Sequence, residues 1–188
     1  MLNRKGSQKC GYVAIVGPTN AGKSTLLNAI LGKKLSIVSR KVQTTRTRIQ
    51  AILTKEDVQL ILIDTPGIFN PKRFKDRSYI KEAISSLEHS DIIVYMVEAN
   101  KGFDKNAYLS LNKMIGAQQI VIVINKIDLV KKPDLLKLMD GIKDSINQDD
   151  IYLLSALKHD GVRVFLDGLM AKIPERKWEY PANQATNI

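Results

Sequence analysis

The chain has 188 residues and a mass of 21.1 kDa, the size of one compact domain. Its 44% hydrophobic and 26% charged residues exclude an intrinsically disordered chain, and its single cysteine, Cys10, excludes an internal disulfide or a site of several thiolates. The formal charge of +10 favours a polyanionic partner, either nucleic acid or an anionic membrane surface. A solvated lysine-rich surface would give the same composition.

The N-terminal region has basic residues, and its apolar run before Gly17, Tyr12–Val16, has only five residues, too few for the core of a secretory signal. No apolar run approaches the roughly 18 residues that span a bilayer. We therefore expect a cytoplasmic protein, with peripheral association with the inner face of the cell membrane as an additional expectation for so basic a chain.

Short apolar runs of strand length alternate with helical patterns along the chain. They occupy Tyr12–Val16, Val58–Ile63, Ile92–Val97, Ile120–Ile124 and Ile151–Leu154. Such runs are typical of strands buried on both faces of a mostly parallel sheet. The segment Ile49–Leu53 forms a hairpin with the strand that follows it, so we predict a six-stranded sheet with one antiparallel strand at its edge.

Amphipathic stripes with a spacing of three or four residues predict the helices. They comprise Ile80, Ala83, Ile84 and Leu87; Leu135, Leu138, Met139, Ile142 and Ile146; and Val162, Phe165, Leu166, Leu169, Met170 and Ile173. We interpret these stripes as core faces. The alternation predicts a three-layer α/β fold with right-handed crossovers, whose ligand lies at the carboxyl ends of the strands.

A phosphate-binding sequence follows the first strand. It has the pattern G-x-x-x-x-G-K-[ST] and consists of Gly17, Pro18, Thr19, Asn20, Ala21, Gly22, Lys23 and Ser24. The glycines let backbone N–H groups turn toward phosphates at a helix N-terminus. Lys23 would reach the β- and γ-phosphates, and the Ser24 hydroxyl would bind Mg²⁺. The alternative is a glycine turn with an incidental lysine.

Asp64, Thr65, Pro66 and Gly67 follow the strand that ends at Ile63. A carboxylate at this strand end can hold Mg²⁺ through its water shell, and the Gly67 N–H can meet a γ-phosphate. By itself the D-x-x-G pattern is often only a turn.

Two further strand ends carry residues suited to guanine. Asp128 can accept hydrogen bonds from guanine N1–H and the N2 amine, which adenine lacks at that edge. Asn125 would tether neighbouring loops, and the stem of Lys126 would cover one face of the base. Ser155 and Ala156 would supply a backbone N–H to guanine O6.

In this order, the motifs resemble those of the translation-factor-like GTPases, and in detail those of the Era family, bacterial ribosome-assembly GTPases whose G domain precedes an RNA-binding KH domain. The resemblance covers residues 11–184 and is carried by GPTNAGKSTLLNAILG, SRKVQTTRTRI, DTPGIFNPK, SDIIVYMVEANKGF, NKIDLV and WEYPANQATN. It implies the P-loop NTPase fold, an N-terminal extension at 1–10, a G domain at 11–173 and, at 174–188, a linker toward a KH domain that this chain lacks.

The resemblance also implies roles for individual residues. Residues 17 to 25, which end at Thr25, would hold the nucleotide, and Leu157, directly after Ser155 and Ala156, would belong to the nucleotide-binding residues with them. Thr45, or its neighbour Thr44, would close on Mg²⁺ and the γ-phosphate; β-propensity in an edge strand is the competing explanation for both. The catalytic set is Lys23, Thr45 and Gly67, and the Mg²⁺ set is Ser24, Thr45 and Asp64.

Two positions suggest how hydrolysis would proceed. Ile68 stands where Ras-type proteins have the glutamine that orients water, so slow intrinsic turnover is expected. Asn20 stands where related potassium-dependent GTPases hold K⁺ against the phosphates, although an asparagine also tolerates a strained loop backbone.

The expected function is that of a GTP-hydrolysing switch in the maturation of the small ribosomal subunit and its 16S rRNA. RNA recognition would lie mainly in the missing KH domain, with the basic segments 33–48 and 72–77 as further contacts, and the chain would be a monomer. The alternatives are a G domain of another potassium-dependent ribosome or tRNA-modification GTPase, and a GTP-binding scaffold that does not hydrolyse.

Overall fold

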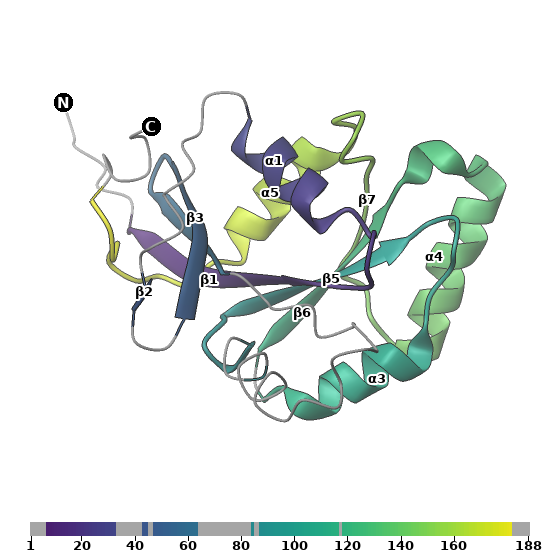
Figure 1. Cartoon of the computed structure of the whole chain (residues 1–188), viewed down its shortest axis with the longest axis horizontal. Coiled ribbons are helices and arrows are strands. Elements are labelled where there is room, and N and C mark those ends of the chain that lie inside the picture. Colours follow the sequence, from purple (N-terminus) through teal and green to yellow (C-terminus); the bar gives the residue numbers. More distant parts are fainter. Residues whose placement is uncertain are drawn as a thin grey trace.

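A computed structural model of the chain describes residues 7–32, 43–44, 47–63, 84, 87–116 and 118–181. Within these residues the strands form one sheet in the order β2-β3-β4-β1-β5-β6-β7 (Figure 1). Their bounds are β1 (Lys9–Val16), β2 (Gln43–Thr44), β3 (Thr47–Lys55), β4 (Val58–Ile63), β5 (Ile92–Glu98), β6 (Gln119–Asn125) and β7 (Ile151–Leu153).

The pairing confirms the mostly parallel sheet with one antiparallel strand. Strands β4, β1, β5, β6 and β7 run parallel, and β3 runs antiparallel to its neighbours β2 and β4. The structure adds a seventh strand, β2, which pairs outside β3, so that β3 is not at the edge. Two residues are too few to show an alternating pattern, and β2 therefore leaves no signal in the sequence.

Helices cover both faces of the sheet. One face carries α1 (Lys23–Leu31) and α5 (Val162–Ala171), and the other carries α3 (Lys105–Met114) and α4 (Lys132–Ile146), as Figure 1 shows. Val94 and Met96 of β5 pack toward α1 and α5, whereas Tyr95 and Val97 pack toward α3 and α4. Burial on both faces explains the continuous apolar runs of the sequence.

The predicted helical stripes line these two cores. Buried members include Val162, Phe165, Leu169, Met170 and Ile173 on one side and Leu135 and Ile142 on the other. Of the stripe that begins at Ile80, only Ile84 and Leu87 lie within the described residues. No helix in the described ranges is long and apolar enough to cross a membrane.

The strand order brings the ends of β1, β5 and β6 together. Val16 of β1 pairs with Tyr95, and Glu98 at the end of β5 pairs with Asn125 at the end of β6. Strand β1 lies between β4 and β5, so the strand order reverses at β1. Ligands of open α/β sheets bind at such a reversal, outside the carboxyl ends of the strands.

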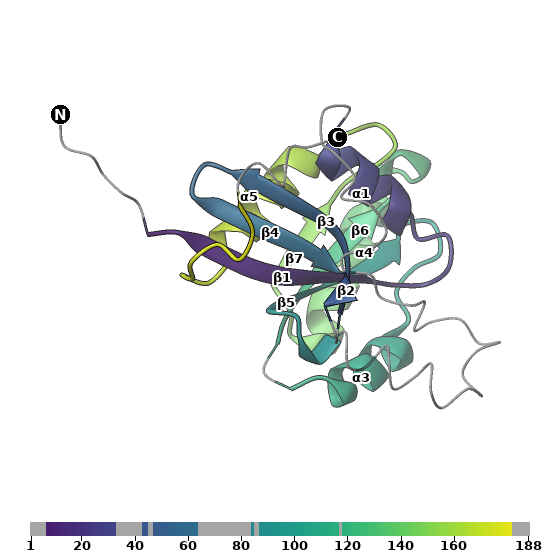
Figure 2. The same cartoon turned by 60° about the vertical axis from the view of Figure 1, so that its left-hand side comes forward.

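Residues 174–181, which we name the C-terminal strap, lie against the beginning of the sheet. Figure 2 shows the strap, in yellow, beside the start of β1. The buried Gln59 side chain of β4 accepts hydrogen bonds from the N–H groups of Glu179 and Tyr180 and donates one to Tyr180 O. Arg176 pairs with Asp91 at 3.0 Å. The part of the expected linker that the structure describes therefore packs on the domain.

Candidate nucleotide-binding site

The loop between β1 and α1 has the backbone of a phosphate cradle. Gly17 and Gly22 have φ of 149° and 94°, a region that favours glycine. A Cβ atom on Gly17 would lie 2.7 Å from the Met96 carbonyl oxygen, and one on Gly22 would collide with the Asn125 side-chain amide. Asn20 adopts a left-handed φ of 69° without a glycine. The glycines of the sequence pattern thus satisfy both the positive φ angles and the close packing of this loop.

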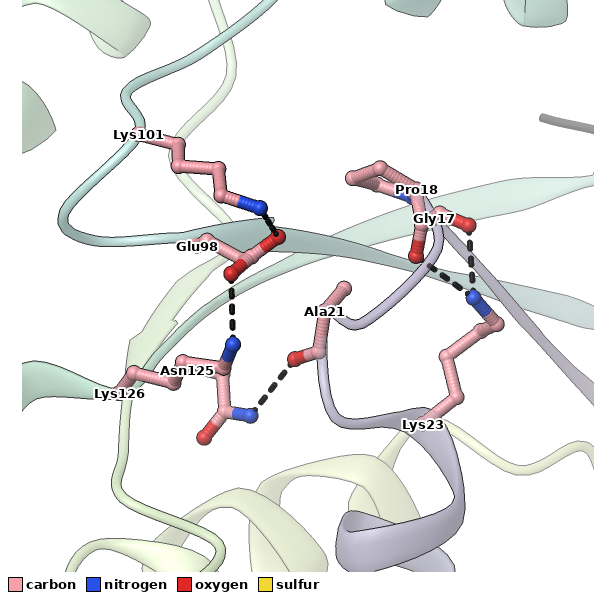
Figure 3. A network of polar contacts seen from close by, with 8 residues as sticks. All are labelled: Gly17, Pro18, Ala21, Lys23, Glu98, Lys101, Asn125 and Lys126. Atoms are coloured by element: carbon pink, nitrogen blue, oxygen red, sulfur yellow. Dashed lines mark hydrogen bonds and ion pairs between the residues drawn. The ribbon is translucent and has the colours of Figure 1, made fainter. Parts of the chain in front are cut away.

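The start of α1 presents positive groups to this loop. Leu26 N–H donates to Gly22 O at 2.8 Å, which is the first hydrogen bond of the helical pattern in α1. The N–H groups of the three residues before Leu26 lie ahead of this bond and therefore have no acceptor within the helix. Lys23 Nζ donates to the carbonyl oxygens of Gly17 and Pro18, each at 2.8 Å (Figure 3). Burial lowers the pKa of Lys23, and the charge of Glu98 partly offsets this effect. These groups suit a bound polyphosphate.

Asn125 joins the phosphate-binding loop to the loop after β7. Its side chain is buried, donates from Nδ2 to Ala21 O at 2.8 Å and accepts at Oδ1 from Ala156 N–H at 3.0 Å. The structure thus shows the tether that the sequence predicted for Asn125. It also gives the Ala156 N–H a protein acceptor, so the guanine O6 contact assigned to Ser155 and Ala156 stays a prediction.

Asp128 lies in the short helix η1 (Ile127–Leu129), directly after β6. It is exposed, as is Leu157 in the loop after β7. Ser155 is buried, and its Oγ accepts a hydrogen bond from Lys158 N–H at 3.2 Å. Because β6 and β7 are neighbours, the N-K-x-D residues (NKxD: Asn125, Lys126 and Asp128) and the Ser155–Ala156 pair border one part of the site.

Glu98 is the site residue that the sequence analysis did not identify. Its carboxylate is 2% exposed, and its two oxygens lie 2.9 Å from Lys101 Nζ and 2.6 Å from Lys126 Nζ (Figure 3). Burial raises the pKa of Glu98, but the two lysines outweigh burial and leave the pKa below its usual value. An acidic residue at the end of an otherwise apolar strand was the available signal.

The Mg²⁺ set falls largely outside the described residues. Thr45, Asp64, Thr65, Pro66 and Gly67 lie there, as does Ile68, and only the backbone of Thr44 is described, in β2. Ser24 is exposed in the first turn of α1, where a hard hydroxyl oxygen fits a cation bound to phosphates. Within the described ranges, no three His, Cys, Asp or Glu side chains form a metal cluster.

The fold, the phosphate-binding loop and the NKxD loop together define a P-loop nucleotide-binding domain. A family model described as "50S ribosome-binding GTPase" matches residues 12–126, and the chain belongs to this family.

Known relatives agree with the resemblance stated from the sequence. GTPase Era from Bradyrhizobium sp. strain BTAi1 is 41% identical over 180 residues, which are 95% of this chain and 58% of the relative. The solved structure of a point variant of Aquifex aeolicus Era bound to GDP·AlF4⁻ is 35% identical with a TM-score of 0.78, and the match covers 96% of this chain and 62% of that one. The resemblance to the Era family is thereby confirmed.

A second solved structure is that of Era in complex with MgGDPNP and nucleotides 1506–1542 of 16S ribosomal RNA. It is 36% identical with a TM-score of 0.76, and the match covers 93% of this chain and 60% of that one. The chain therefore spans about three fifths of the length of the relatives it matches.

Proposed function

We propose that this chain is the G domain of an Era-type switch, which binds GTP with Mg²⁺ and hydrolyses it during maturation of the small ribosomal subunit. The observation that carries this proposal is the Asn125 tether. One buried side chain fixes the phosphate-binding loop relative to the loop that would contact the base. A nucleotide must be held at its phosphates and at its base. This tether sets the distance between the two loops that would hold them.

Each group then has a defined task. Lys23 would turn from its two carbonyl partners to the β- and γ-phosphates, while the first N–H groups of α1 hold the phosphate oxygens. Ser24, with Asp64 and Thr45 or Thr44, would hold Mg²⁺, which when bound neutralises charge on the phosphates. The Gly67 N–H would meet the γ-phosphate. The Era complex with MgGDPNP supports the Mg²⁺ and GTP parts.

Two alternatives to this proposal are another ribosome or tRNA-modification GTPase and a GTP-binding scaffold. The relatives named GTPase Era favour this family over a different ribosome or tRNA-modification GTPase. A scaffold that binds GTP without hydrolysing it differs in phosphate release, which the following experiment measures.

We expect phosphate release from GTP to be at least about tenfold faster in K⁺ than in Na⁺, because a K⁺ ion held by Asn20 would stabilise charge that develops on the phosphates. Phosphate release is followed in Mg²⁺ at matched ionic strength. Asn20→Gly removes the side chain but accommodates the left-handed backbone, and it should abolish the difference between the two salts.

Lys23→Ala is the inactive control for this assay. Equal rates in the two salts would remove the K⁺ role and leave the hydrolysis intact. No phosphate release in either salt, with GTP bound, would favour the scaffold.

The distribution of charge along the sequence favours RNA contacts in the segments 33–46 and 64–83. The described residues hold 17 of the 29 Lys and Arg and 16 of the 19 Asp and Glu, so their charges nearly cancel. The other 12 cationic residues, with only 3 acidic ones, lie in 1–6, 33–46 and 64–83. The last two segments contain Thr45, Asp64 and Gly67, which are among the residues proposed to contact Mg²⁺ and the γ-phosphate. The Era complex with 16S rRNA supports a ribosomal RNA partner.

We expect weak, largely sequence-independent RNA binding by this chain. On single strands the log–log slope of affinity against salt should be about −0.7 per phosphate contact. A fragment of 16S rRNA is titrated across salt with GDP and with a non-hydrolysable GTP analogue. Replacing Lys33 and Lys34 by alanine should weaken binding more than replacing Lys131 and Lys132, two exposed lysines of the charge-balanced core. Tight, salt-insensitive and sequence-selective binding would contradict this arrangement.

We also propose the boundaries 1–10, 11–173 and 174–188 for the extension, the G domain and the linker, with the strap as the part of the linker that packs on the G domain. We place the chain in the cytoplasm as a monomer, with peripheral membrane contact through its basic segments. Light scattering with and without anionic vesicles tests the last two points.

A further inference from the structure

Glu98 is an acidic residue in an unusual environment for a carboxylate. It ends β5, directly beside Asn125 at the end of β6, and its carboxylate is almost fully buried between two lysines. A buried carboxylate is costly unless it is paired, so its partners here are specific. The N–H groups of Lys101 and Gly102 donate to the Glu98 carbonyl oxygen, which fixes the turn after β5.

The two lysines are not equivalent. The Lys101 side chain is 61% exposed and lies on the turn that leads to α3. Lys126 is 29% exposed and belongs to the NKxD loop, where its backbone adopts a left-handed φ of 65°. Such a backbone is unfavourable for a residue with a Cβ atom and needs support from surrounding contacts. The Glu98 carboxylate supplies one at 2.6 Å.

We propose that Glu98 is a positioning residue for base binding: it anchors the Lys126 ammonium so that the aliphatic stem of Lys126 forms one wall of the guanine site. This inference rests on the proposed function. The anchor acts in the ligand-free protein, so it prepares the wall before the nucleotide arrives. Because GDP and GTP carry the same base, Glu98 should contribute equally to the binding of both.

A competing role for Glu98 would be to act on Lys23, whose pKa its charge raises. The hydrogen bonds of Lys23 go to Gly17 and Pro18 instead. The two roles predict different kinetics. Positioning of Lys126 changes affinity and KM with kcat preserved, whereas an effect through Lys23 changes kcat at saturating GTP.

The test measures dissociation constants and dissociation rates of fluorescent GDP and of a non-hydrolysable GTP analogue, together with KM and kcat for GTP. Glu98→Gln is expected to weaken both nucleotides by about tenfold, through faster dissociation, with kcat unchanged. Lys101→Ala, which removes the other partner of the same carboxylate, should stay within about twofold of the wild type.

A second variant isolates the anchor without changing Glu98. Lys126→Met keeps an aliphatic stem over the base but cannot pair with Glu98, which retains Lys101. It should lose affinity to the same extent as Glu98→Gln, and the double variant should lose no more than either single one. This variant also serves if Glu98→Gln does not fold.

Three results would overturn the proposal: wild-type affinity in Lys126→Met, additive losses in the double variant, or a loss in Lys101→Ala as large as in Glu98→Gln. Failure of the wild-type chain to bind either nucleotide would instead reject the proposed function, so the two failures are distinguishable.

Discussion

Replacing Asp128 with asparagine is expected to change the preferred base from guanine to xanthine. The carboxylate of Asp128 would accept hydrogen bonds from guanine N1–H and the N2 amine, whereas an amide at this position donates to the oxygen that xanthine carries at C2. Sites built on such hydrogen bonds reject the wrong partner by about 10⁴-fold. We expect a shift of this order in the ratio of GTP affinity to xanthosine triphosphate affinity.

Competitive titration of both nucleotides against the variant measures this ratio. Asp134→Asn is the matched control, because Asp134 undergoes the same chemical change at an exposed position in the first turn of α4. It should leave the preference for GTP unchanged. An unaltered preference in Asp128→Asn would show that the base lies elsewhere.

The sequence predicted the layers of this fold well because strands buried on both faces and helices buried on one face leave different patterns. Val94 and Tyr95 point into opposite cores, and both positions must be apolar for that reason. The elements that the sequence did not predict are those without such a pattern. The two residues of β2 are too short for one, and the packing of the strap depends on Gln59, a polar residue whose buried hydrogen bonds no local rule predicts.

The candidate site likewise has parts that the sequence predicted and parts that it did not. Motifs with fixed spacing located the phosphate-binding loop and the NKxD residues, since their chemistry is local to one strand end. Contacts between strand ends were less accessible. The tether of Asn125 could be stated as a tendency, but its partners Ala21 and Ala156 follow only from the strand order. Glu98 needed the structure, because its role depends on Lys126, 28 positions away.

The site therefore consists of loops whose relative positions are set by a few buried polar side chains. Gly22 has no side chain where Asn125 passes, and Asn125 in turn reaches both Ala21 and Ala156. Both hydrogen bonds are buried, so neither group has water as an alternative partner. This dependence predicts that the loops lose their mutual order together when the tether is removed.

Asn125→Ala should weaken GDP and GTP binding by about 10²-fold or more, because it leaves the buried Ala21 carbonyl and Ala156 N–H without their partner, at roughly 1–3 kcal/mol each. Asn125→Asp is the sharper variant. It keeps an acceptor for Ala156 N–H but places a carboxylate oxygen against the Ala21 carbonyl. We expect it to bind no better than the alanine variant, although its size is nearly that of asparagine.

Nucleotide titration and thermal unfolding, measured together on each variant, separate binding from stability. Asn106→Ala is the control, since Asn106 is exposed on α3 and should leave both quantities unchanged. If the tether positions the loops, affinity falls by more than any loss of folded protein explains. If Asn125→Asp keeps wild-type affinity, the hydrogen bond to Ala21 does not position the phosphate-binding loop. Wild-type affinity in Asn125→Ala would show that other contacts hold the two loops in place relative to each other.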